Sequence, residues 1–378
     1  MLYLDAAATS PVRPEVLQAM WPYLTGDFGN PSSQNELGFS ASTGLTAARA
    51  VVARQLGVRA TGIVFTSGGT EADNLAIKGI ALGDPRGRHL VVSAIEHEAV
   101  LESVRYLERL HGFEVTVLPV DEHGLVSAGR LAAVLRPDTT LVSIMYANNE
   151  IGTVQPITEL AAVARAAGVP FHTDAVQAAG WLPLDLGELG VDALTISGHK
   201  LGAPKGVGAL AIRARVPLEP LVHGGGQERG IRSGTENVAG AVALARALEL
   251  SDRRAAEGVA RWRDRLVDGV LAAVPDAVLT GHRQARLPGH ASFVFAGTSG
   301  ESLLLELEQR GIVSSSGSAC AAGSDEPSSV LLAVGIPPRI AQTAVRFTFG
   351  AEVVDTDVEV VIDAVTASVA AVRALSPR

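Results

Sequence analysis

Lys200 and Asp174 are the two residues whose types and setting point most directly to chemistry. Lys200 follows the apolar run 192–196 and closes the string Ser-Gly-His-Lys, and Asp174 ends a second apolar run, 169–173. Runs of this kind are typical of buried strands. Pyridoxal 5'-phosphate chemistry needs a lysine that bonds to the cofactor and a carboxylate that keeps its pyridine nitrogen protonated, so that the ring acts as an electron sink. The pair therefore predicts a pyridoxal phosphate site, with a plain surface lysine as the alternative.

A glycine-rich turn within residues 66–74 offers a place for the phosphate. Its string Thr-Ser-Gly-Gly-Thr-Glu-Ala-Asp-Asn follows a strand candidate and opens a helix candidate. N–H groups at a helix start bind phosphate, the glycines including Gly69 allow close approach, and Thr70 adds a hydroxyl. The alternative is a plain helix cap, which is compatible with a phosphate site. Ser197 and His199, beside the lysine, are further candidate phosphate donors.

Three other residues are candidates for contacts with a cofactor or substrate. His97 follows a strand candidate, where an imidazole can stack on an aromatic ring and carry protons near neutral pH. Asn149 also follows a strand candidate, although its Asn- and Gly-containing string would suit a turn equally well. Arg346 lies within the apolar run 345–349, and its planar fork suits the carboxylate of an amino acid. Its alternatives are exposure to water or an ion pair with Glu352.

Two stretches are predicted to be loops. Residues 314–327 are small, polar and glycine-containing, and they carry Cys320, the only cysteine of the chain. One cysteine excludes an internal disulfide and a zinc site built on cysteines, and no metal site is expected. A thiol on such a loop can reach into a site, whereas the alternative is a small buried hydrophobe. Residues 223–237 are too glycine-rich to pack as a regular element.

Strand-length apolar runs alternate with helical patterns between about residues 60 and 213. This alternation predicts βαβ units and a mainly parallel sheet covered by helices on both faces. Ligands of such sheets bind beyond the carboxyl ends of the strands, which several of the polar residues above follow. The strand candidates are residues 62–65, 89–94, 113–118, 140–146, 169–173, 193–197 and 207–212, and the helix candidates are 71–80, 99–110, 128–135 and 157–167.

The pattern changes after Gly234. Residues 237–274 favour helix for most of their length, and short strand candidates follow at 291–295, 312–315 and 345–349 before a final helix of about 356–375. This composition predicts a smaller α+β domain in the C-terminal part of the chain.

Composition limits the class of protein. With 378 residues, 47% of them hydrophobic and 19% charged, the chain can bury a large core and form two domains. A net charge of −9 disfavours binding to nucleic acid and to anionic membranes. The first residues lack the pattern of a secretion signal, and no apolar stretch is long enough to span a membrane. We therefore expect a cytoplasmic protein.

Taken together, these strings resemble the cysteine desulfurases of the NifS and IscS group, which are pyridoxal phosphate enzymes of aminotransferase class V. The resemblance runs from the string Tyr-Leu-Asp-Ala-Ala-Ala-Thr at residues 3–9 to the final helix. It implies aminotransferase fold type I. The large cofactor-binding domain would take residues 14–255, and residues 1–13 with 256–378 would form the small domain that carries the cysteine loop.

The resemblance also implies a role for each candidate residue. Asp174 and Gln177 would contact the pyridine nitrogen and the ring oxygen, and His97 would stack on the ring. The string Arg-Ser-Gly-Thr at residues 232–235 resembles a loop through which one subunit of a homodimer completes the phosphate site of the other. The implied cofactor-binding residues are Gly69, Thr70, His97, Asn149, Asp174, Gln177, Ser197, His199, Lys200 and Thr235.

The reaction implied by the resemblance converts L-cysteine to L-alanine. Asn149 and Arg346 would hold the substrate carboxylate, and Cys320, Lys200 and His97 would be the catalytic residues. Sulfur would remain on Cys320 as a persulfide, as in the long-loop subgroup, for an acceptor protein that the sequence leaves open between an iron–sulfur scaffold and a tRNA-thiolation enzyme. The alternatives are a selenocysteine lyase, another class V aminotransferase, or a non-enzymatic interaction protein on the same fold.

Overall fold

The computed structural model describes residues 1–251, 253–317, 326–355 and 357–375. Its largest element is a seven-stranded sheet in the order β2-β8-β7-β6-β5-β3-β4. Strand β8 runs antiparallel to both of its neighbours, and the remaining pairs are parallel. The strands are β2 (Ile63–Thr66), β3 (His89–Ser93), β4 (Glu114–Leu118), β5 (Thr139–Ser143), β6 (Phe171–Asp174), β7 (Ala193–Ser197) and β8 (Gly208–Ile212). The predicted mainly parallel sheet is confirmed.

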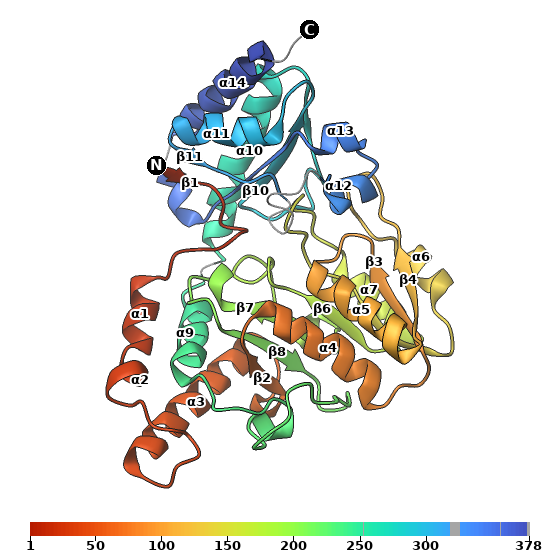
Figure 1. Ribbon diagram of the computed structural model, residues 1–378, viewed down its shortest axis with the longest axis vertical. Coiled ribbons are helices and arrows are strands. Elements are labelled where there is room, and N and C mark those ends of the chain that lie inside the picture. The colour runs from red at the N-terminus through yellow and green to blue at the C-terminus, as the bar shows by residue number, and fades with distance from the viewer. Residues whose placement is uncertain (252, 318–325, 356, 376–378) are drawn as a thin grey trace.

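Helices cover both faces of this sheet, as Figure 1 shows. Alternate side chains of each strand point to opposite faces, so that Val64 packs in one apolar core and Ile63 in the other. The first core lies under α4 (Gly69–Gly83) and α5 (Glu98–His111). The second lies under α1 (Pro14–Met20), α3 (Glu36–Gln55), α7 (Ile157–Ala166) and α9 (Val238–Glu249). The shorter helices α6 (Ala128–Val134) and α8 (Leu186–Leu189) complete this part of the chain.

The N-terminal helices α1 (Pro14–Met20), α2 (Pro22–Thr25) and α3 (Glu36–Gln55) were not anticipated from the sequence. Much of the buried face of α3 consists of small residues, including Gly38, Ala41, Gly44 and Ala48, so its apolar stripe is weak. Close packing requires these small residues, because a Cβ atom at Gly44 would lie 2.3 Å from the ring of Tyr23.

A second group of elements combines both ends of the chain. Strands β12 (Ala344–Thr348), β10 (His290–Phe295) and β9 (Ala277–Leu279) form an antiparallel sheet, and β1 (Leu2–Tyr3) pairs with β11 (Ile312–Val313). Leu4 shares a separate apolar core with residues of these strands and of the helices packed on them. The helices of this region are α10 (Ala255–Ala273), α11 (Gly300–Gln309), α12 (Ser329–Ala333), α13 (Pro338–Ala341) and α14 (Val358–Leu375). The division at residues 13 and 255 stays a prediction.

The helices of the described residues are too short or too polar to cross a membrane.

Candidate active site

One cavity of about 570 Å³ collects the predicted site residues at the carboxyl ends of the central strands. Asp174 and Ser197 end β6 and β7, and His97 follows the turn after β3. Cys320 lies outside the described residues. Thr235 is described and exposed, and it does not line the cavity. The predicted residues that line the cavity are Gly69, Thr70, His97, Asn149, Asp174, Gln177, Ser197, His199, Lys200 and Arg346.

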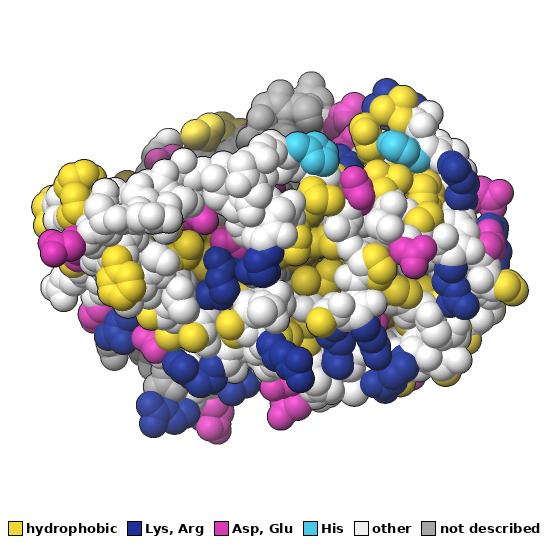
Figure 2. Space-filling view, turned by 90° about the horizontal axis from the view of Figure 1, so that it is seen from below, with side chains coloured by type: hydrophobic (Ala, Val, Ile, Leu, Met, Phe, Trp, Pro, Cys, Tyr) yellow, Lys and Arg dark blue, Asp and Glu magenta, His cyan; other side chains and the backbone are white. Residues whose placement is uncertain are grey.

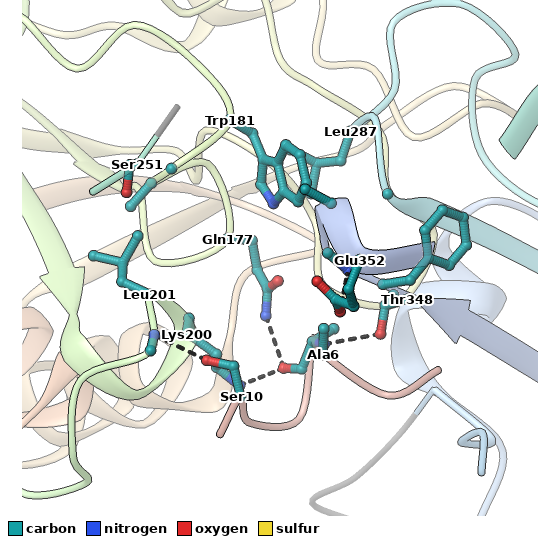
Figure 3. A pocket seen from close by; sticks show the side chains of 18 of the residues that line it. Ala6, Ser10, Gln177, Trp181, Lys200, Leu201, Ser251, Leu287, Thr348 and Glu352 are labelled. Carbon is teal, nitrogen blue, oxygen red and sulfur yellow. Dashed lines mark hydrogen bonds between the residues drawn. The ribbon is translucent and has the colours of Figure 1, made fainter. Parts of the chain in front are cut away.

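Lys200 reaches the N-terminal segment of the chain. Its Nζ donates hydrogen bonds to the carbonyls of Ala7 and Ala8, the second at 2.7 Å. Gln177 Nε2 donates to the same carbonyl of Ala7 at 3.1 Å. Figure 3 shows Gln177 and Lys200 converging on this segment from the side of a neighbouring pocket. The string at residues 3–9 therefore belongs to the site, which no feature of its composition indicated.

The cavity contains three buried carboxyl groups, Asp73, Glu96 and Asp174. Burial raises the pKa of Asp174, while His97 and Lys200 act against that rise. Burial and the charge of Asp174 hold the pKa of Asp73 well above its ordinary value, and burial raises that of Glu96 to about 8. Among the described residues, Asp73 Oδ1 and Glu96 Oε2 have no hydrogen-bond partner. A cationic ring nitrogen beside Asp174 suits this acidic wall.

The start of α4 is open toward the same cavity. No side chain of the described residues caps this helix, whose first residue is Gly69. A Cβ atom at Gly69 would lie 2.9 Å from Val176 Cγ2, so only glycine lets the turn pack this closely. Thr70, Ser197 and His199 line the same cavity, and a Cβ atom at Gly69 would lie 3.4 Å from Ser197 Cβ. Free N–H groups and hydroxyls at the positive end of a helix fit a phosphate group.

His199 is neutral at pH 7. Burial first and the charge of Lys200 second lower the pKa of its imidazole to about 4. Its Nδ1 lies 3.2 Å from Thr9 Oγ1, so the ring is held in place. His199 can therefore donate or accept a hydrogen bond at the phosphate position without carrying a charge of its own.

His97 caps the start of α5. Its Nδ1 accepts a hydrogen bond from the backbone N–H of Ala99 at 3.1 Å, which places the proton of the neutral imidazole on Nε2. The adjacent Glu96 accepts from Ser93 Oγ and from the N–H of Met145 at 2.9 Å. Glu96 thus connects the turn that carries His97 to the segment that carries Asn149.

Arg346 is buried, with 1% of its surface exposed. Its Nη2 lies 2.8 Å from Asp5 Oδ1, and its Nη1 donates to the carbonyls of Asn149 at 2.9 Å and Gly317 at 3.0 Å. Exposure to water and a pair with Glu352 are therefore wrong as alternatives, since Glu352 instead accepts from the N–H of Gly350. Arg346 Nε has no partner among the described residues.

The comparison with known proteins decides the family. The model of the family described as "Aminotransferase class-V" matches residues 2–361. The chain is 46% identical to "Cysteine desulfurase IscS" of Dictyoglomus turgidum and 47% identical to the protein of the same name from Methanosarcina thermophila, over all of this chain and 96% and 94% of theirs. This chain belongs to the aminotransferase class V family. Membership confirms the resemblance noted from the sequence, including an enzyme that uses pyridoxal 5'-phosphate.

Solved structures agree with this membership. A structure titled "NIFS-LIKE PROTEIN" superposes with a TM-score of 0.90 and 36% identity, covering 98% of this chain and 99% of that one. A second, titled "SspA in complex with cysteine", has a TM-score of 0.82 and 35% identity over 92% of this chain and 99% of its own. The predicted fold type I is confirmed.

Sequence reasoning missed four acidic residues of the site. Asp5 follows the apolar residues of β1, and Glu96 precedes His97, so both occupied positions that a strand-end rule could have selected. Asp73 lies buried on α4, in the string of residues 66–74 from which only Gly69 and Thr70 were selected. Glu150 is mostly buried and accepts from Ser328 Oγ at 2.5 Å, and burial raises its pKa. Contacts with residues distant in the sequence bring these four side chains to the site, so local sequence patterns do not identify them.

We expect Arg346→Ala to raise KM for L-cysteine about ten- to a hundredfold, since a hydrogen bond to a charged group contributes roughly 1.5–3 kcal/mol. Cofactor content should change little. Arg346→Lys keeps the positive charge but not the planar guanidinium, so its KM for L-cysteine should lie between those of the wild type and Arg346→Ala. Steady-state kinetics with a measured cofactor content checks this, and a wild-type KM in Arg346→Ala would leave the arginine a purely structural role through Asp5.

Glu96 should make the stability of the cofactor-free protein depend on pH. Its folded-state pKa of about 8 lies above the ordinary value of 4.5, so the native state keeps a proton that the unfolded chain has released. This stabilisation is complete at low pH and is lost as pH rises through about 8, by on the order of a few kcal/mol. Glu96→Gln stays neutral, so wild-type Tm should fall relative to Glu96→Gln between pH 6 and pH 9. Glu98→Gln, at an exposed position, is the control. A Tm difference between wild type and Glu96→Gln that stays constant from pH 6 to pH 9 would contradict the raised pKa of Glu96.

Proposed function

We propose that this protein is a cytoplasmic cysteine desulfurase that converts L-cysteine to L-alanine and transfers the sulfur to Cys320. One observation carries the proposal: Lys200, Asp174 and the open start of α4 face a single cavity. A lysine, an acidic partner and a phosphate site at these positions are the contacts that pyridoxal phosphate requires, and the relatives named above carry the name of this activity.

Bound pyridoxal phosphate supplies an electron sink for the charge that develops at the α-carbon of the substrate. The Lys200 amine removes the α-proton, because it is the amine that lines the cavity at the end of β7. Arg346 and the Asn149 side chain orient the substrate carboxylate. His97, with its proton on Nε2, holds a proton at the face of the cavity.

The sulfur step uses the thiolate of Cys320 as nucleophile. It attacks the substrate sulfur, so that an S–S bond forms, the C–S bond breaks, and its electron pair passes to the substrate carbons, which take up protons to give alanine. The described residues before and after Cys320 support this role, because they contact or line the cavity. Gly317 accepts from Arg346, and Ser328 lines the cavity and bonds to Glu150.

The test is the release of alanine and sulfide from L-cysteine, with and without reductant. We expect one alanine for each sulfur, and sulfide only when reductant frees it from the enzyme. Alanine formed with L-selenocysteine alone would favour a selenocysteine lyase. Products that require a 2-oxo acid as amino acceptor would favour an aminotransferase.

We further propose that the protein is a homodimer in which Thr235 completes the phosphate site of the partner subunit. Large apolar side chains are exposed on and between α1, α2 and α3, and Figure 2 shows hydrophobic side chains at the surface of the end seen from below. Burying such a surface favours association. The exposed side chains are Leu17, Trp21, Leu24, Phe28, Leu37 and Phe39.

Mixed dimers test this arrangement. Thr235→Ala and Lys200→Ala chains are each expected to be impaired alone. Mixing them should restore activity, because one site of each mixed dimer then combines an intact Lys200 with the partner's intact threonine. Failure of any mixture to regain activity would contradict the shared site. The acceptor of the sulfur, an iron–sulfur scaffold or a tRNA-thiolation enzyme, would be identified by sulfur transfer from the loaded enzyme.

A further inference from the structure

The loop of residues 222–237 is fastened to the large sheet by a buried ion pair. Glu228 lies in the loop with 2% of its side chain exposed, and Arg49 on α3 is 14% exposed. Two hydrogen bonds of 2.7 and 2.5 Å join the guanidinium to the carboxylate in the bidentate form. The guanidinium carbon of Arg49 also lies 4.8 Å from the centre of the Phe65 ring.

This pair covers the free edge of β2. The N–H of Phe65 donates to Glu228 Oε2 at 3.2 Å, and the carbonyl of Ile63 accepts from Arg49 at 2.9 Å and from Arg229 at 2.6 Å. Strand β2 pairs only with β8 in the described sheet, so these contacts satisfy groups that would otherwise face solvent. Figure 1 shows the loop beside α3 and β2 at the lower end of the molecule.

The fastened turn has a strained backbone. Glu228 and Arg229 have φ angles of +47° and +59°, in the left-handed region that residues with a side chain rarely adopt. They are the only non-glycine residues with positive φ among those the structure describes. Gly226 and Gly230, on either side, lie in the same region. Strain of this kind persists where the surrounding contacts fix the conformation, and it collects at functional positions.

The contacts continue from the turn to Thr235. Gln227, next to Glu228, accepts from the N–H of Gly234 through its side-chain oxygen at 2.8 Å. Arg232 Nε donates to Glu71 Oε1 at 2.8 Å, and Glu71 Oε2 accepts from the N–H of Ser67 at 2.8 Å. The loop is thus bound on one side to the phosphate turn of its own subunit. Thr235, in the same loop, is exposed.

We propose that Glu228, held by Arg49, is a positioning residue that keeps loop 222–237 in its strained conformation and so sets Thr235 at the phosphate of a cofactor bound in a second subunit. This inference rests on the shared phosphate site proposed above. Through Arg232 and Glu71, the same loop links that site to the phosphate turn of its own subunit.

Cofactor-loaded Glu228→Gln and Arg49→Lys proteins test the inference. Both are conservative and should fold, but the first removes the charge and the second removes the bidentate fork. We expect the dissociation constant for pyridoxal phosphate to rise about tenfold in each variant, as for one weakened charge-assisted contact. The dimer should persist. Amide hydrogen exchange in residues 222–237 should accelerate. Arg54→Ala is the matched control on the same helix, because Arg54 is exposed and its ion pair with Glu249, at 3.5 Å, lies at the surface.

Thr235→Ala, measured beside them, separates the two proposals. Weakened cofactor binding in Thr235→Ala, Glu228→Gln and Arg49→Lys, with Arg54→Ala unchanged, supports the positioning role. Weakened binding in Thr235→Ala with wild-type binding in Glu228→Gln and Arg49→Lys contradicts that role and leaves the shared site intact. Wild-type binding in all of them contradicts the shared site itself, and the inference with it.

Discussion

Lys200→Ala should lose the covalent link to pyridoxal phosphate. Its desulfurase rate should fall by about 10²- to 10⁴-fold or more, because a positioned general base contributes a factor in this range. The physical reason is that Lys200 is the lysine that lines the cavity, where it faces the same space as Asp174 and the start of α4. Borohydride treatment of the wild type should fix the cofactor to a peptide that contains Lys200. The variant should yield no such peptide.

Lys205 provides the matched control, because it is an exposed lysine only five residues further along the chain. Lys205→Ala should keep the wild-type adduct and rate. A borohydride-stable adduct in Lys200→Ala, on any peptide, would show that another lysine holds the cofactor and would overturn the assignment of the site.

Cys320→Ser should still bind pyridoxal phosphate and L-cysteine but should release no sulfide at a useful rate. Binding uses Lys200, Asp174 and Arg346, which the substitution leaves in place, whereas a serine hydroxyl is a far weaker nucleophile toward sulfur and stays protonated at neutral pH. The chain contains no other cysteine that could replace the thiol. Visible absorbance changes on addition of L-cysteine, measured beside sulfide release, separate binding from turnover. Sulfide release at the wild-type rate would contradict the role of Cys320 as the nucleophile.

Most strands of the large sheet were predictable because they lie in short, largely apolar runs, as buried strands tend to do. Strand β4 is partly exposed and reads Glu-Val-Thr-Val-Leu, but its alternation also marked it as a strand. The carboxyl ends of the strands then located Asp174, His97 and Lys200 at one edge, where the structure places them in one cavity. By contrast, α3 buries much alanine and glycine, and α11 was not recognised between two short strands. Short local patterns do not predict such helices, since tertiary packing decides them.

Contacts between residues far apart in the sequence also could not be predicted. Arg346 was expected to have a carboxylate partner, but the partner in the structure is Asp5, at the opposite end of the chain. Glu228 lies in the stretch that was predicted only to be a glycine-rich loop, whereas the structure buries it against Arg49. Such pairs depend on how the sheets and helices pack, which periodicity within a segment does not report.

Mass spectrometry of the peptide that contains Cys320, after one treatment of the enzyme with L-cysteine, tests the central claim most directly. The account predicts one added sulfur atom on this peptide, removable by reductant, together with one L-alanine for each sulfur gained. Wild-type enzyme that forms alanine while this peptide gains no sulfur would contradict it.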